Sequence, residues 1–176
     1  MRVHREHCSY RLHGFWKSTT GRILAERLGW PFIDIDREIE SVHARSALSL
    51  FRELGEVKFR AAEAEIMAKC LALPTTVVAL GGAAVDLLEN QRLLREHYTG
   101  LLVFLDGPFD VLIERCLEEA GNDMSTYRPL LHLREKAFAR FESRRDWNRT
   151  NAGMRVDVSS QSCEEAATEI ARHISF

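Results

Sequence analysis

The sequence predicts an α/β protein in which helices cover both faces of a mostly parallel sheet. Short runs of apolar and β-branched residues alternate with longer amphipathic segments, which is typical of βαβ units. The chain has 176 residues, of which 45% are apolar and 28% charged. This length and composition favour a single domain with a sizeable core.

Four short runs are the predicted strands, and helices fill the intervals between them. We expect strands at 31–35, 75–80, 100–105 and 154–158. We expect helices at 17–28, 56–71, 85–98, 108–120, 133–148 and 163–174. Residues 43–54 interrupt the alternation with a short helical stretch, and the polar segment 121–127 has the composition of a mobile loop.

Charge and cysteine content exclude several classes of protein. The formal net charge is -2, so no basic excess predicts a nucleic-acid or anionic-membrane partner. The four cysteines lie far apart and show no metal-ligand spacing, which favours free thiols. The start of the chain lacks a secretory signal, and no apolar run is long enough to span a membrane. We therefore expect a cytoplasmic protein that acts on small molecules.

The most informative stretch is GFWKSTTGR, residues 14–22, at the start of the first predicted helix. In a phosphate-binding P-loop, a lysine neutralises the β- and γ-phosphates and the hydroxyl after it ligates Mg²⁺. N–H groups at the start of the helix also hold the phosphates. Lys17, Ser18 and Thr19 fit the second half of this motif.

The first half of the loop departs from the motif. Arg11 and Trp16 stand where glycines are needed to bring N–H groups onto the phosphates, and only Gly14 keeps the glycine character. Residues 7–11 are polar, although a central parallel strand is normally apolar. We hypothesise that residues 6–16 are an out-of-frame reading. Read one nucleotide downstream, their codons can encode Asn-Ile-Val-Leu-Ile-Gly-Phe-Met-Gly-Ser-Gly, and sequencing the coding DNA tests this.

Together with the later motifs, the chain resembles the shikimate kinase family over essentially all of its length. The matching segments are KSTTGRILAERLGWPFIDIDREIE at 17–40, FRELGEVKFRAAE at 51–63, LGGAAV at 80–85 and RPLL at 128–131. An arginine follows in the next helix. The resemblance implies a P-loop, three-layer α/β/α fold of the nucleoside-monophosphate-kinase type, with a mostly parallel five-stranded sheet. It implies one domain, 1–176, with a substrate-binding insertion at about 36–63 and a lid at about 121–132.

The resemblance also implies an activity and its co-substrates. The γ-phosphoryl group of ATP is transferred, with Mg²⁺, to the 3-hydroxyl of shikimate, a step of chorismate and aromatic amino-acid biosynthesis. Lys17 and Arg128 are assigned to the transferring phosphoryl group, where positive charge stabilises the reaction. Ser18 and Asp34 are assigned to Mg²⁺. The other implied nucleotide contacts are Gly14, Phe15, Trp16, Thr19, Arg115 and Gln161.

The acceptor site is implied in the same way. Asp34 and Asp36 alternate along a predicted strand, so we expect them to point to opposite sides at its C-terminal end. The resemblance assigns Asp36 to the shikimate hydroxyls, where it aligns or deprotonates the attacking oxygen. Arg60 and Arg144 are assigned to the shikimate carboxylate, which a guanidinium fork orients through two parallel hydrogen bonds.

Three further positions border the implied acceptor site. Glu63 lies three residues after Arg60, on the same helix face, and is expected to hold that arginine. Gly81 and Gly82 follow a strand and let the backbone approach the substrate closely. The family usually has a third glycine where this chain has Ala83.

Other interpretations of these residues and of the function remain open. Paired aspartates also cap helices, and for Arg52, Arg140 and Arg145 we prefer an exposed, salt-bridged position. The chain is alternatively an inert shikimate-binding protein with a damaged nucleotide site, or a kinase for another small hydroxy acid. We expect a monomer.

Overall fold

A computed structural model describes the chain at residues 8–11, 15–82, 84–112, 114 and 134–174. Within these residues, five strands form one sheet in the order β2-β3-β1-β4-β5, and every neighbouring pair is parallel. The strands are β1 (Cys8–Arg11), β2 (Phe32–Asp34), β3 (Val77–Ala79), β4 (Leu101–Asp106) and β5 (Met154–Asp157). The predicted fold class is confirmed, and the four predicted strands are present with somewhat different bounds.

The polar segment before the phosphate loop forms the central strand of the sheet. Cys8 pairs with Val77 of β3 on one side and with Leu101 of β4 on the other. The connection from β1 leads to β2 on one side of the sheet, and the connection from β3 leads to β4 on the other side. The strand order therefore reverses between β1 and β3. Ligands of open α/β sheets bind at such a reversal, beyond the carboxyl ends of the strands.

Residues 109–112 of the predicted helix 108–120 are helical, and seven further helical segments in the described residues accompany the sheet. They are α1 (Phe15–Leu28), α2 (Ile35–His43), α3 (Ala47–Leu71), α4 (Leu88–Arg92), the π-helix η1 (Leu93–His97), α6 (Arg134–Asn151) and α7 (Cys163–Ile174). The prediction for 163–174 is confirmed at its bounds. Most of the predicted helix 108–120, the loop 121–127 and the lid 121–132 lie outside the described residues.

One helix was not predicted, and two helix predictions need correction. Helix α2 was not predicted, because its start follows directly from a strand and is set by a side-chain cap rather than by a loop. Helix α3 begins at Ala47, where Ser46 caps it, and Gly55 (φ 74°) breaks its helical geometry at the point where we expected a separate helix to start. The segment 85–98 is helical only from Leu88, first as α4 and then as η1.

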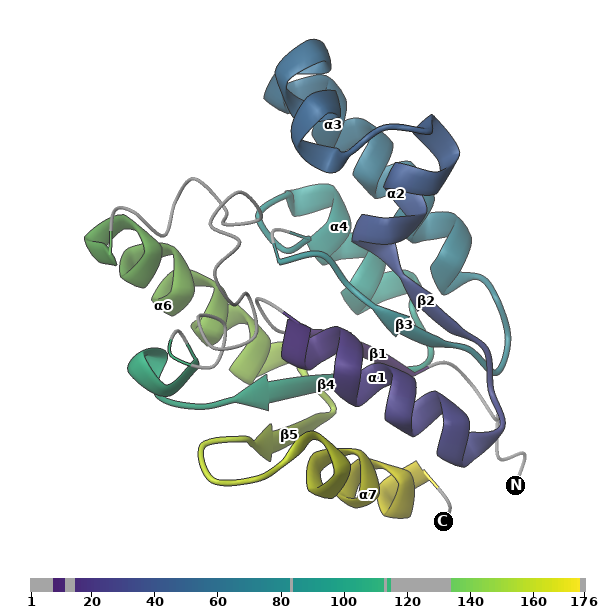
Figure 1. Ribbon diagram of the computed structural model, residues 1–176, viewed down its shortest axis with the longest axis vertical. Coiled ribbons are helices and arrows are strands. Elements are labelled where there is room, and N and C mark those ends of the chain that lie inside the picture. The colour runs from purple at the N-terminus through teal and green to yellow at the C-terminus, as the bar shows by residue number, and fades with distance from the viewer. Residues whose placement is uncertain (1–7, 12–14, 83, 113, 115–133, 175–176) are drawn as a thin grey trace.

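The sheet separates two apolar cores, because successive side chains of a strand point to opposite faces. Figure 1 shows the helices on the two sides of the sheet. Val77 packs against α1 and α7, whereas the next residue, Val78, packs against α2 and α3. The helices therefore form a layer on each side of the sheet. Within the described part of the chain, no helix combines the length and apolar character needed to cross a membrane.

Candidate active site

Lys17 lies at the carboxyl edge of the sheet, in the first turn of α1. Its ammonium group is almost completely buried and donates a hydrogen bond to the carbonyl oxygen of Leu80, 2.8 Å away and just beyond β3. The same Nζ is 3.9 Å from Oδ2 of Asp34 and 4.0 Å from Oδ2 of Asp36. A buried ammonium is stable only with such partners. The structure therefore fixes a positive charge between the ends of β2 and β3.

Asp34 performs two tasks at once. Its Oδ1 accepts a hydrogen bond from the N–H of Asp36 at 3.0 Å and thereby caps α2, which is the capping role that remained open from the sequence. Its Oδ2 accepts a hydrogen bond from the hydroxyl of Ser18. The two residues expected to bind Mg²⁺ are thus in direct contact.

The expectation that Asp34 and Asp36 alternate along one strand is wrong. Strand β2 ends at Asp34, and Asp36 already lies in the first turn of α2. The cap formed by Asp34 starts the helix immediately after the strand, so both carboxylates turn towards Lys17. The negative charges at the start of α2 also suit the partial positive charge of a helix N-terminus.

A second group of residues borders Asp36. Nη1 of Arg60 lies 2.7 Å from Oε2 of Glu63, which confirms that Glu63 holds this arginine. A Cβ atom placed on Gly81 would lie 2.6 Å from Oε1 of Glu63 and 2.8 Å from Oδ1 of Asp36. The backbone after β3 therefore approaches both carboxylates more closely than any other residue type would allow, and this explains the glycine.

Arg144, on α6, is buried but does not stand alone. Its Nε donates to Oδ1 of Asp86 at 2.7 Å, and its Nη2 pairs with Oδ2 of the same carboxylate. Asp86 lies in the loop that also contains Gly81 and Gly82. No sequence pattern predicted this partner.

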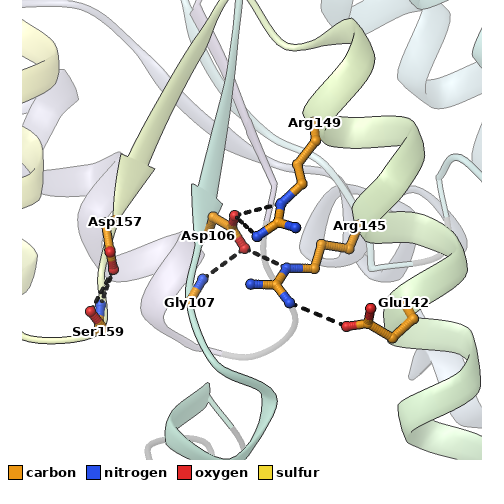
Figure 2. Close-up of polar contacts among 7 residues, drawn as sticks. All are labelled: Asp106, Gly107, Glu142, Arg145, Arg149, Asp157 and Ser159. Carbon is orange, nitrogen blue, oxygen red and sulfur yellow. Dashed lines mark hydrogen bonds and ion pairs between the residues drawn. The ribbon is translucent and has the colours of Figure 1, made fainter.

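Asp106, at the end of β4, organises a further charged group (Figure 2). Its Oδ1 accepts from Nε of Arg145 at 2.8 Å and from the N–H of Gly107 at 2.9 Å, and its Oδ2 accepts from Nε of Arg149 at 2.9 Å. Burial lowers the pKa of Arg145, but hydrogen bonds and charges of Asp106 and then Glu142 outweigh it and raise that pKa overall. The preference for an exposed Arg145 is therefore wrong in part, because the arginine is salt-bridged but mostly covered.

The remaining predicted residues are distributed as follows. Trp16 packs against the core on the α1 side of the sheet, Thr19 is exposed on α1, and Gly82 is buried beside Gly81. Gln161, beyond β5, donates from Nε2 to Oε2 of Glu169 at 2.9 Å. Gly14, Ala83, Arg115 and Arg128 lie outside the described residues, as do the side chains of Arg11, Phe15 and Arg140. Arg52 is exposed, as expected.

Among the described residues, no group of three or more His, Cys, Asp or Glu side chains is arranged to hold a metal ion. Mg²⁺ does not need such a cage, because it usually binds through one or two protein oxygens together with phosphates and water. Oxygen ligands are the kind that Mg²⁺ prefers, and Ser18 and Asp34 supply a contiguous pair of them. The donor set therefore fits this ion.

This arrangement of a lysine, a hydroxyl and carboxylates beyond a parallel sheet defines a class of enzyme. P-loop kinases transfer phosphoryl groups mainly by positioning and electrostatic stabilisation, and they place these groups at the start of the first helix and at the ends of the strands. The fold and the site put the chain in this class.

Comparison with known proteins identifies the family. The shikimate kinase family model matches residues 13–175. A shikimate kinase of Persephonella marina is 34% identical over 161 residues, covering 92% of this chain and 93% of the relative. One of Symbiobacterium thermophilum is 36% identical over 162 residues, covering 90% of each chain. The chain belongs to the shikimate kinase family.

A solved structure agrees with this assignment. The shikimate kinase of Acinetobacter baumannii, in complex with shikimate, superimposes with a TM-score of 0.83 at 27% identity. The comparison covers 98% of this chain and 94% of that structure. The agreement therefore includes the whole sheet and both helical layers.

Proposed function

We propose that the chain transfers the γ-phosphoryl group of ATP to the 3-hydroxyl of shikimate. The observation that carries this proposal is the position of Asp36. Its Oδ2 is 4.0 Å from the Lys17 ammonium on the phosphate side, and its Oδ1 faces Gly81 beside Glu63 on the other side. A hydroxyl bound against Asp36 therefore lies next to the positive charge that would stabilise the phosphoryl group during its transfer to that hydroxyl.

On the phosphate side, Lys17 stabilises the charge that develops on the transferring group. Its ammonium is fixed in place before the reaction, so no reorganisation is needed when charge develops. Ser18 and Asp34 would hold Mg²⁺, which neutralises phosphate charge when bound. Arg128 supplies a second positive charge from the lid.

On the acceptor side, Asp36 accepts the proton of the attacking hydroxyl as the new P–O bond forms and ADP leaves. Arg60 and Arg144 bind the carboxylate of the acceptor, and the backbone at Gly81 and Gly82 packs against its ring. Glu63 is only 2% exposed and keeps Arg60 oriented for this contact. Orientation by fixed side chains accounts for a large share of such rate enhancements.

The remaining nucleotide contacts are proposed at the start of α1 and near the base. Gly14, Phe15, Trp16 and Thr19 border the phosphates, and Arg115 and Gln161 border the adenine. Gln161 supports this role because its Oε1 is buried and has no hydrogen-bond partner among the described residues. A hydrogen-bond acceptor such as this Oε1 atom matches the exocyclic amino group of adenine, which is a hydrogen-bond donor.

The direct test is a coupled assay of ADP release with ATP, Mg²⁺ and shikimate, combined with calorimetry of each ligand alone. We expect turnover that depends on all three components and is lost in Asp36→Asn. A chain that binds shikimate but neither binds ATP·Mg²⁺ nor turns over would contradict the kinase proposal. That result would favour the inert binding protein suggested by Arg11 and Trp16 in the loop.

The same assay addresses the acceptor. If another small hydroxy acid is used with a higher kcat/KM than shikimate, the acceptor proposed here is wrong. We further propose a single-domain monomer in the cytoplasm, with the acceptor insertion at about 36–63 and the lid at about 121–132. Light scattering during size-exclusion chromatography tests the oligomeric state.

A further inference from the structure

The guanidinium proposed for the acceptor's carboxylate already carries a carboxylate from the protein. Nε of Arg144 lies 2.7 Å from Oδ1 of Asp86, and Nη2 pairs with Oδ2. This two-point contact is the same geometry by which a guanidinium binds a carboxylate of a ligand. Asp86 therefore has the charge and the shape of the group that Arg144 is expected to receive.

The two partners differ in their access to water. The side chain of Arg144 is 10% exposed, whereas that of Asp86 is 36% exposed. An arginine in that position is costly without a partner, so a carboxylate from the protein lowers the energy of the state without ligand. Asp86 can regain water when it leaves, and Arg144 cannot.

The backbone just before Asp86 is held by two hydrogen bonds. The N–H of Ala84 donates to the carbonyl oxygen of Gly81 at 3.1 Å. Nε2 of Gln91 donates to the carbonyl oxygen of Val85 at 2.8 Å. These bonds fix the backbone, so a change of partner at Arg144 needs only a rotation of the Asp86 side chain.

We propose that Asp86 is an internal competitor for the acceptor's carboxylate. It pairs with Arg144 in the absence of acceptor, and the carboxylate of the acceptor displaces it. The inference rests on the proposed function, because it uses Arg144 as a carboxylate-binding residue. Two carboxylates on one edge of a guanidinium repel each other, so the two pairings exclude one another.

Competition of this kind sets affinity and selectivity. The apparent dissociation constant equals the intrinsic constant divided by the fraction of molecules whose site is open. Asp86 therefore raises the concentration of acceptor needed for binding. It also favours acceptors that bear a carboxylate, because a neutral ligand does not displace Asp86 and therefore binds without a contact to Arg144. Asp86 thus acts as a specificity-determining residue through Arg144.

The test is titration calorimetry of the full chain with shikimate, without nucleotide, so that the state of the phosphate loop does not matter. We expect Asp86→Asn to bind shikimate about threefold to tenfold more tightly, since a neutral amide competes less well for the guanidinium. Asp86→Glu keeps the charge and should stay close to the unmodified protein. For the carboxamide analogue of shikimate, which lacks the charge, Asp86→Asn should show no gain.

Glu89→Gln is the matched control, because Glu89 is exposed in the adjacent helix α4 and loses the same charge. It should leave shikimate affinity unchanged. Thermal melting of each variant shows that it is folded. If Asp86→Asn binds shikimate no more tightly than the unmodified chain, or more weakly, Asp86 does not compete with the acceptor's carboxylate. That result would show that Asp86 only positions Arg144.

Arg144→Ala separates this failure from a failure of the proposed function. If Arg144→Ala binds shikimate as well as the unmodified chain does, Arg144 is not a carboxylate-binding residue. The role of Arg144 in the proposed function and the competition by Asp86 are then both wrong. If Arg144→Ala binds more weakly while Asp86→Asn shows no gain, the inference about Asp86 alone is wrong. If the unmodified chain does not bind shikimate, the acceptor in the proposed function is wrong.

Discussion

Replacing Gly81 by alanine adds one methyl group where two carboxylates meet the backbone. The new Cβ would lie 2.6 Å from Oε1 of Glu63 and 2.8 Å from Oδ1 of Asp36, whereas ordinary contact begins at 3.4 Å. The first oxygen must therefore move by about 0.8 Å and the second by about 0.6 Å, or the backbone must move instead. No part of this cost comes from the conformation of Gly81, which does not have a positive φ.

The two carboxylates cannot yield equally. The side chain of Asp36 is 35% exposed and can turn towards water, but it then leaves its position beside Lys17. Glu63 is buried and is bound to Arg60 at 2.7 Å, so its movement carries the arginine with it. Crowding of this kind costs about 1–3 kcal/mol of stability. A displacement of reacting groups by about 1 Å costs about 100-fold in rate.

We therefore expect Gly81→Ala to lower kcat/KM for shikimate by about 100-fold, measured by coupled ADP release, and to weaken shikimate binding in calorimetry. Gly29→Ala is the control, because Gly29 has φ +65° and no atom within 4 Å of a new Cβ. Its strained backbone should cost about 1–2 kcal/mol of stability without loss of activity. If Gly81→Ala keeps the kcat and KM of the unmodified chain, the convergence of Asp36 and Glu63 on the acceptor is refuted.

Three further outcomes follow from the described residues. Burial raises the pKa of the Cys70 thiol, so iodoacetamide should label Cys70 more slowly in the folded chain than in urea, as followed by peptide mass mapping. Asp106→Ala leaves two arginines without their shared carboxylate and should lower the free energy of unfolding in urea by about 2–4 kcal/mol. The double substitution Arg11→Gly and Trp16→Gly should strengthen ATP·Mg²⁺ binding in calorimetry, because it restores the glycines that the phosphate loop requires.

The raised pKa of the Cys70 thiol also affects stability. Because this thiol ionises first in the unfolded chain, the free energy of unfolding should fall as the pH rises through the ordinary thiol range. Equal labelling rates in the folded and unfolded chain would exclude a buried thiol. The control for Asp106→Ala is Asp146→Ala, which removes an exposed carboxylate from α6, the helix of Arg145 and Arg149. It should change the free energy of unfolding by less than about 0.5 kcal/mol. A glycine double variant that binds ATP no better than the unmodified chain would show that the first half of the loop is not the obstacle.

Local patterns predicted the parts of the site that depend on local geometry. Lys17 and Ser18 follow from their place at a helix start, and the pair of Arg60 and Glu63 follows from their spacing on one helix face. Prediction from the sequence failed where one side chain decides between two local structures. Asp34 ends strand β2 and caps helix α2, so Asp36 lies in the helix and not in the strand where we expected it.

The partners of Arg144 and Arg145 could not be predicted for a different reason. Asp86 is 58 positions from Arg144, and Asp106 is 39 positions from Arg145. No periodicity relates such residues, because their contact depends on how α6 packs against the sheet. The preference for an exposed Arg145 failed on this point, since most arginines on a helix are indeed exposed and only the tertiary fold decides otherwise.

The two unforeseen ion pairs together determine the rotation of α6 about its axis. Adjacent residues of a helix point about 100° apart, so Arg144 and Arg145 cannot face the same partner. Arg145 and Arg149 are one turn apart and both reach Asp106 at the end of β4 (Figure 2). Arg144 instead faces Asp86 in the loop after β3. Asp106 therefore holds the helix in the orientation in which Arg144 reaches Asp86, in the loop that also contains Gly81. Its removal should therefore weaken shikimate binding in calorimetry as well as stability, because Asp106 acts on Arg144 through α6.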